Sequence, residues 1–344
     1  MARALVLYSG SLASRIALKL AREVRGLELR VIYFRSPFFH ECEGLEQTFR
    51  ELARCISFRT KTLKREYLHI ALGSDSLPFP CGACRRVLLS RAARTARRLH
   101  AEYIITGEVV GKGGMDGDKL ARLDAELGLV GHVIRPVSGR LLSSTRAELQ
   151  GVWPREALFD ITVDEPERMR ALGEQLGLVG GVEAERRCSL SNPVYARRLL
   201  DVLREGLPTV NTLRLLEFKH FFFIPPDLKV VVATDPGEQA TLQTLFLPTD
   251  VRLYLPLPRS PLVLARADWS RHAEKEREQA VVTAASIALA MAGFPGGETC
   301  DVCFRFEWEE ETRRLVVTSP GKAELSSLLS GGLMSSPVGV YLSS

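Results

Sequence analysis

Three cysteines are the residues of this chain best suited to chemistry. Cys81 and Cys84 stand three positions apart in Pro80-Cys81-Gly82-Ala83-Cys84, and Cys188 follows much later in the sequence. The C-x-x-C spacing lets two sulfurs reach one centre. The thiolate binds metals and attacks sulfur, and the start of the helix expected here would favour that form. The three thiols could therefore form a metal site, an iron–sulfur site or a sulfur relay.

A second close pair, Cys300 and Cys303, has the same spacing in a different setting. It lies in an apolar segment, 300–306, that is typical of a strand. Residues three apart on a strand face opposite sides, so we interpret this pair as structural. The alternative for the first pair is likewise two unrelated buried thiols. A purely structural zinc site would normally need four protein ligands.

Two loops, each following a short apolar run, are rich in small polar residues that can direct N–H groups and hydroxyls at a phosphate. These residues are Ser9, Gly10, Ser11 and Ser14 in the first loop, and Thr106, Gly107, Glu108 and Gly111 in the second. Turns and helix caps favour the same residue types, which is the alternative interpretation. The first loop is therefore a candidate phosphate site, and the second is a candidate ligand loop.

A strongly basic helix is expected directly after Cys84. Residues 85–99 hold six arginines and no acid. At about 100° per residue, Arg91, Arg94 and Arg98 fall on the side opposite the apolar positions. Such a stripe can neutralise the phosphates of RNA, although a solvated helix face is the alternative.

The elements that position these residues alternate between strands and helices. Apolar runs predict strands at 4–8, 29–34, 56–63, 103–106 and 132–135, and helical spacing predicts helices at 12–24 and 45–52. This alternation predicts a parallel sheet with helices on both faces. In such a sheet ligands bind at the carboxyl ends of the strands, where both polar loops would lie.

The sequence pattern changes after about residue 215, where prolines separate short apolar runs. Strands near 229–233, 251–255, 302–308 and 315–318 and a helix at 274–292 indicate an α+β pattern. We therefore expect an α/β domain at 1–215 and a smaller α+β domain at 216–344. The segment 326–344, rich in serine and glycine, is expected to be a loose tail.

Composition agrees with a folded protein of two domains. The chain has 344 residues, of which 46% are apolar and 25% charged, with a net charge of +5. These values argue against wholesale disorder. No apolar span approaches the roughly 18 to 20 residues that a membrane helix needs, so we expect a cytoplasmic protein with no membrane partner. Seven cysteines in a reducing compartment favour ligation or reaction over disulfides.

Taken together, five segments resemble the PP-loop ATP pyrophosphatases, the nucleotide-hydrolase family that includes tRNA 2-thiouridine and 4-thiouridine synthases. Members of that family look like chains that carry five motifs in this order: S-G-G-x-D-S, P-C-x-x-C-H, T-G-E-V-x-G-Q, R-P-x-S-x-K-L-L and G-C-L-L-T-D-P. The corresponding segments here are 9–14, 80–85, 106–112, 135–142 and 187–193. The resemblance covers residues 4–200.

The resemblance implies a Rossmann-like PP-loop domain and an activity. In the family, ATP with Mg2+ adenylates a tRNA base, pyrophosphate leaves, and sulfur then replaces the activated oxygen. It implies that Cys81, Cys84 and Cys188 are catalytic, either as ligands of a 4Fe-4S cluster with one open iron or as a persulfide relay. The resemblance implies ATP at the two polar loops, and the implied partners are tRNA and a sulfur donor. The oligomeric state, including a homodimer, is left open. The later domain distantly resembles the RNA-binding part of NFACT-type proteins.

Two departures bear on catalysis. Ser11 stands where the family has its second glycine, and Ala13 stands where it has aspartate. The loop thus lacks a carboxylate that could organise a cation, and electrostatic stabilisation of the transition state is reduced. We expect an ATP-dependent tRNA sulfurtransferase. The alternative is a non-catalytic RNA-binding or sulfur-carrier protein that keeps the fold.

Overall fold

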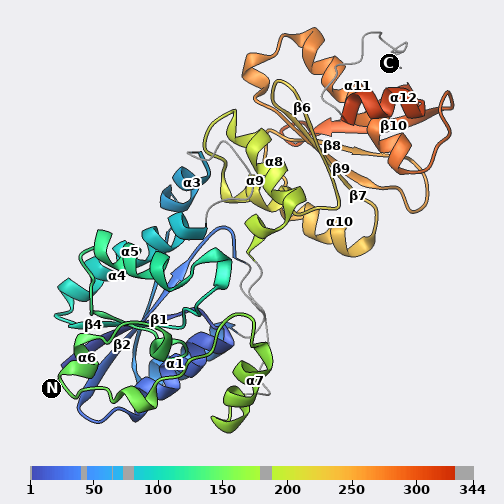
Figure 1. Ribbon diagram of the computed structural model, residues 1–344. Coiled ribbons are helices and arrows are strands. Elements are labelled where there is room, and N and C mark those ends of the chain that lie inside the picture. Colours follow the sequence, from blue (N-terminus) through green and yellow to red (C-terminus); the bar gives the residue numbers. More distant parts are fainter. Residues whose placement is uncertain (1, 40–44, 64, 73–80, 179–187, 330–344) are drawn as a thin grey trace. The chain divides into compact units, whose positions relative to one another are not determined.

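The computed structural model describes residues 2–39, 45–63, 65–72, 81–178 and 188–329. The chain divides into two compact units, Met1–Ala196 and Arg197–Ser344, which are described separately here (Figure 1). The division falls within helix α8 (Pro193–Leu203), whereas the sequence suggested a boundary near residue 215.

The first unit is built on a parallel five-stranded sheet in the order β3-β2-β1-β4-β5. Its strands are β1 (Ala2–Tyr8), β2 (Leu27–Arg35), β3 (Ser57–Thr62), β4 (Tyr103–Thr106) and β5 (Val133–Ile134). In register, Val6 of β1 lies opposite Val31 on one side and Ile105 on the other. The parallel α/β fold expected from the alternating pattern is therefore confirmed.

Helices cover both faces of this sheet (Figure 1). They are α1 (Leu12–Glu23), α2 (Leu45–Cys55), α3 (Arg65–Leu72), α4 (Cys81–Arg98), α5 (Gly117–Glu126), α6 (Arg146–Leu149) and α7 (Pro166–Gln175). Helices α3, α5, α6 and α7 are absent from the sequence prediction. Helix α4 begins at Cys81, so the C-x-x-C segment forms its first turn rather than a preceding turn.

The alternation of side chains along β1 shows which helix covers each face of the sheet. Ala4, Val6 and Tyr8 of β1 pack in the core that holds Ala17 and Leu18 of α1. Leu5, between them, lines a crevice with Thr95 and Leu99 beside α4, because successive side chains point to opposite faces. Helices α1 and α4 thus cover opposite faces.

The second unit contains an antiparallel six-stranded sheet in the order β11-β10-β8-β9-β7-β6. The strands are β6 (His220–Ile224), β7 (Leu228–Ala233), β8 (Val251–Tyr254), β9 (Leu262–Arg266), β10 (Thr299–Phe306) and β11 (Arg313–Thr318). The helices are α9 (Val210–Leu215), α10 (Pro236–Gln243), α11 (Glu274–Met291) and α12 (Lys322–Leu329). The expected α+β pattern is confirmed.

Helix α11 supplies much of the second core. Residues 280–289 are all buried, and their alanines, valines and leucines pack against the sheet. Cys300 packs against this core and Cys303 does not, which agrees with a strand that points them to opposite sides. Helix α12 occupies the start of the expected loose tail, and residues 330–344 lie outside the described residues.

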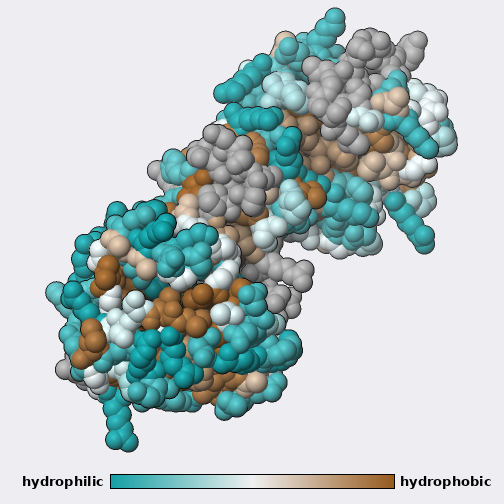
Figure 2. Space-filling view, viewed as in Figure 1, coloured by the Kyte–Doolittle hydropathy of each residue, from teal (hydrophilic) through white to brown (hydrophobic). Residues whose placement is uncertain are grey.

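Hydrophilic residues cover most of the face shown in Figure 2, with smaller hydrophobic areas between them. None of the helices that the structure describes is both long and apolar enough to cross a membrane.

Candidate functional site

The carboxyl ends of the parallel strands meet at one edge of the first sheet, and the candidate residues gather there. The Ser9–Ser14 loop follows β1, the loop from Gly107 follows β4, and the segment from Arg135 follows β5. Helix α4 precedes β4, so its first turn with Cys81 and Cys84 lies toward the same edge. The fold therefore brings both predicted loops and the thiol pair to one side of the sheet.

The Ser9–Ser14 loop is held by its own hydroxyls. Ser11 caps α1, its side chain accepting a 3.4 Å hydrogen bond from the amide of Ser14, and Ser9 N donates to Ser14 Oγ at 3.2 Å. Gly10 has a positive φ of 83°, a conformation that glycine adopts without strain. The loop is thus fixed without using all of its donors.

Three amides at the start of α1 are available to a ligand. Within the described chain, the backbone N–H groups of Gly10, Leu12 and Ala13 have no hydrogen-bond partner. Unpaired N–H groups at a helix N-terminus attract anions, and the helix dipole adds to this. Amides and serine hydroxyls suit a phosphate group, so this loop fits the phosphates of ATP. The same loop offers no carboxylate for Mg2+.

The loop after β4 approaches the first loop closely. A Cβ on Gly107 would lie 2.5 Å from the amide nitrogen of Ser14 and 2.7 Å from the carbonyl carbon of Ala13. The loop is fixed further along, because Val110 N donates to Ser138 Oγ, which donates to Ile161 O at 2.6 Å. The two predicted nucleotide loops are therefore in backbone contact, and only glycine fits between them.

The three thiols lie near one another beside this loop. A Cβ on Gly113 would lie 3.0 Å from Cys81 Sγ, so α4 touches the turn that follows Gly111. Cys188 forms an isolated antiparallel bridge with Phe39, after the end of β2. Cys81 and Cys188 each contribute to the electrostatic environment of Cys84. Thiols from two distant segments thus share one location.

Burial decides the protonation of two of these thiols. It raises the pKa of Cys84 to about 12, with smaller contributions from Cys188 and Cys81, and it also raises the pKa of Cys188. The expectation that the helix N-terminus would favour the thiolate is wrong for Cys84, because desolvation outweighs the nearby Arg85 charge.

A buried network of charges connects the thiol helix to the loop after β4. Arg85 Nε lies 3.4 Å from Glu108 Oε1, and Arg135 Nε donates to Glu108 Oε2 at 2.9 Å. Arg135 also binds both carboxylate oxygens of Asp124, at 2.7 and 2.8 Å. Burial lowers the pKa of Arg135, but Asp124 and Glu108 outweigh it and raise the value. Arg85 Nη1 and Glu108 Oε1 are buried with no hydrogen-bond partner in the described chain.

The thiols do not form the ligand set of a single metal ion. Among the described residues, no three histidine, cysteine, aspartate or glutamate side chains are arranged to hold one. One tetrahedral ion needs every sulfur within about 2.3 Å of a single point. Cysteine thiolates are the usual ligands of 4Fe-4S clusters, so the donor chemistry of these three residues suits such a cluster.

The arginine stripe of α4 is only partly free. Arg94 and Arg98 are exposed and have no ion pair with any described residue. Arg91 is partly buried and forms an ion pair with Glu66 of α3. Arg91, which we expected on the outer side with the other two, thus already has a carboxylate partner from α3.

Sequence reasoning missed the residues that join the loops. Asp124, in the middle of α5, gave no signal, because its role depends on Arg135 reaching it in the fold. Arg135 and Ser138 belong to the segment 135–142 that resembles a family motif, but nothing in the sequence was a reason to place either of them in the site. Gly113, which contacts Cys81, could have been found from the glycine cluster that follows Gly111.

No family model matches the chain, and no curated protein matches it. Among solved structures, the U34-tRNA thiolase NcsA from Methanococcus maripaludis with its [4Fe-4S] cluster is similar at 16% identity and a TM-score of 0.31, over 64% of this chain and 74% of that chain. A predicted subunit of tRNA methyltransferase from Methanocaldococcus jannaschii is similar at 14% identity and a TM-score of 0.30, over 52% of this chain and 89% of that chain. NMN synthetase from Francisella tularensis is similar at 13% identity and a TM-score of 0.27, over 51% of this chain and 84% of that chain. At such TM-scores, these likenesses assign no function to this chain.

Proposed function

We propose that the first unit uses ATP to activate a tRNA base and delivers sulfur to it. The observation that supports this most is the convergence of two loops and three thiols at one edge of the sheet. Gly107 contacts the Ser9–Ser14 loop, and Gly113, six residues later, contacts Cys81. A site that binds phosphate and a site that holds sulfur thus share one short segment.

In the proposed reaction, the base carbonyl oxygen attacks the α-phosphorus of ATP and pyrophosphate leaves. Sulfur then bonds to the activated carbon, and the carbon–oxygen bond breaks to release AMP. The amides of Gly10, Leu12 and Ala13 would hold the phosphates and stabilise charge that develops on the leaving pyrophosphate. Glu108, held by Arg135, ties the second loop to the segment that follows β5.

Cys81, Cys84 and Cys188 would hold the sulfur, as cluster ligands or as a persulfide. A bound 4Fe-4S cluster with one open iron would present sulfide to the activated carbon. In the relay form, a persulfide donor transfers its terminal sulfur to one cysteine, and that terminal sulfur bonds to the activated carbon as AMP leaves. A second cysteine then attacks the Sγ of the first, the S–S bond breaks, and the thiolated base leaves while the two cysteines form a disulfide. A thiol reductant must then regenerate the pair.

A second candidate function is supported by a separate observation. The Ser9–Ser14 loop carries no carboxylate, since Ala13 occupies the position where the similar family has aspartate. Hydroxyls and amides can bind ATP in its ground state without stabilising the transition state. On this basis the chain would be a non-catalytic protein that binds RNA or carries sulfur.

Mass spectrometry of tRNA nucleosides from a deletion strain tests the proposal. A thionucleoside should disappear in that strain and return with the wild-type gene, but not with Cys84→Ala. Cys303→Ala serves as the control and should restore the nucleoside, because Cys303 lies in β10 of the other unit. An unchanged nucleoside profile in the deletion strain would exclude the enzymatic proposal.

A further inference from the structure

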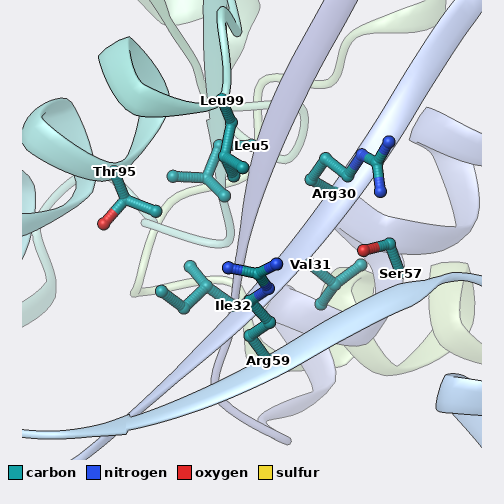
Figure 3. A pocket seen from close by; sticks show the side chains of 8 residues that line it. All are labelled: Leu5, Arg30, Val31, Ile32, Ser57, Arg59, Thr95 and Leu99. Atoms are coloured by element: carbon teal, nitrogen blue, oxygen red, sulfur yellow. The ribbon is translucent and has the colours of Figure 1, made fainter.

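A basic groove lies between α4 and the edge strand β3. It is a small depression, partly open to solvent, and its lining residues come from β1, β2, β3 and the C-terminal end of α4 (Figure 3). Leu5, Ile32 and Leu99 form an apolar floor. Ser57, Thr95, Arg30 and Arg59 add hydroxyls and guanidinium groups around it.

Strand alternation places three cations of the sheet on this side. Phe58 of β3 packs into the core under α1, so Arg59 and Lys61 point to the opposite face, the one that α4 covers. Arg59 lies in register with Ile32 and Lys61 with Phe34, while Arg30 lies opposite Ser57. Because β3 is at the edge of the sheet, Arg59 and Lys61 are exposed.

Most of these charges are not neutralised. Arg59 and Lys61 form no ion pair with a described residue, and neither do Arg94 and Arg98 on α4. Arg30 shares the single carboxylate of Glu28 with Arg3. The groove therefore has an excess of positive charge from the strands that line it, and Arg94 and Arg98 add charge on the outer side of the neighbouring α4.

We infer that this groove binds the sugar–phosphate backbone of RNA through Arg59 and Lys61 of β3, and that the RNA continues over the outer side of α4 to Arg94 and Arg98. RNA carries one negative charge on every nucleotide, so a row of separate cations can each find a phosphate. The apolar floor suits ribose and base surfaces, and the hydroxyls of Ser57 and Thr95 can bond to ribose. This inference rests on the proposed function for its choice of RNA.

The chain offers a matched pair of double variants. Arg59→Ala with Lys61→Ala removes two charges from the groove. Arg22→Ala with Arg25→Ala removes two exposed, unpaired charges at the end of α1 and just after it, on the opposite face of the sheet. Arg59→Lys with Lys61→Arg keeps the charge and should keep binding, and melting temperatures verify the fold of each variant.

The experiment measures the affinity of unmodified tRNA over a range of salt concentrations. Loss of Arg59 and Lys61 should weaken binding and reduce the logarithmic salt slope by about 1.5 units, since each phosphate contact contributes about 0.7 to 0.9. The α1 control should keep the wild-type slope. An unchanged slope in the groove variant, or an equal fall in the control, would overturn the inference.

Two further results separate this inference from the proposed function. If wild-type protein binds no tRNA, the proposed function fails together with the groove. If wild-type protein binds tRNA and the groove variant binds it equally well, only the groove is wrong. Polyglutamate that competes as well as RNA would indicate an acidic protein partner and would also overturn the inference.

Discussion

Gly107 determines how closely the two nucleotide loops can approach. Its position leaves no space for a Cβ, which would lie 2.5 to 2.7 Å from backbone atoms of Ala13 and Ser14. Backbone atoms cannot move aside as the end of a flexible side chain can. The close approach is therefore a property of one residue.

Gly107→Ala should greatly weaken ATP binding, because the added methyl group forces the two loops apart. Titration of the protein with a fluorescent ATP analogue measures this. Gly117→Ala is the control, since a Cβ there would lie 3.4 Å from Leu142, an ordinary contact. Equal affinity in both variants would show that the phosphates bind elsewhere.

The thiol trio makes a separate prediction at the residue scale. Protein reconstituted anaerobically with iron and sulfide should hold close to four irons per chain, and Ala at position 81, 84 or 188 should abolish the cluster. Iron and sulfide assays with absorption spectra measure this, with Cys300→Ala as the control. Iron that persists after all three are replaced, or a wild type that holds only zinc, would contradict the cluster.

At the scale of elements, the network of Arg85, Glu108, Arg135 and Asp124 joins α4, the β4 loop, the β5 loop and α5. Burial raises the pKa of Asp124 above its usual value, while the hydrogen bond from Arg135 lowers it. Removing one partner of a buried pair leaves the other charge unpaired. Arg135 binds two carboxylates, so its substitution is expected to destabilise the network more than substitution of any other member.

Arg135→Met should lower the free energy of unfolding by about 3 to 5 kcal/mol, as measured by urea denaturation. Asp124, buried and without Arg135, would then have a folded-state pKa above its unfolded one. Its destabilising effect grows as pH rises, so the variant should regain stability between pH 7 and 5. Adding Asp124→Asn and Glu108→Gln should recover much of the loss. A variant as stable as wild type at pH 7 would contradict this account.

The arginines of α4 should differ in their effect on RNA binding. Arg94→Ala with Arg98→Ala should reduce the salt slope of tRNA affinity by about 1.5 units. Arg91→Ala should leave the slope unchanged, because Arg91 is already paired with Glu66. Filter binding across a salt series distinguishes them, and a slope that falls only with Arg91 would show that the helix contacts RNA through its α3 side.

Periodicity predicted the five strands of the first sheet, four of the six strands of the second, and the longer helices α1, α2 and α11. It did not predict β6 and β9, the short helices such as α3 and α6, or the start of α4, where cysteines gave no helical signal. The site was predicted where small residues and thiols have recognisable spacing. Asp124 and Glu66 could not be found, since their partners are far apart in sequence and meet only after folding.

At the scale of the molecule, the chain combines a parallel α/β unit with an antiparallel unit, and every proposed catalytic residue lies in the first. The first unit thus holds both the nucleotide loops and the thiols. Whether this unit catalyses the reaction depends on charge at the Ser9–Ser14 loop, where Ser11 and Ala13 replace a glycine and a carboxylate of the similar family.

The most direct test is a reaction of purified protein with ATP, tRNA and inorganic sulfide, followed by mass spectrometry of the nucleosides. The account predicts a thionucleoside that requires ATP, appears with equal pyrophosphate, and is lost in Cys84→Ala. Ser11→Gly with Ala13→Asp should raise the rate about 10- to 1,000-fold by restoring electrostatic contacts to the transition state. No thionucleoside and no pyrophosphate from either protein, with tRNA binding intact, would contradict the proposed enzyme.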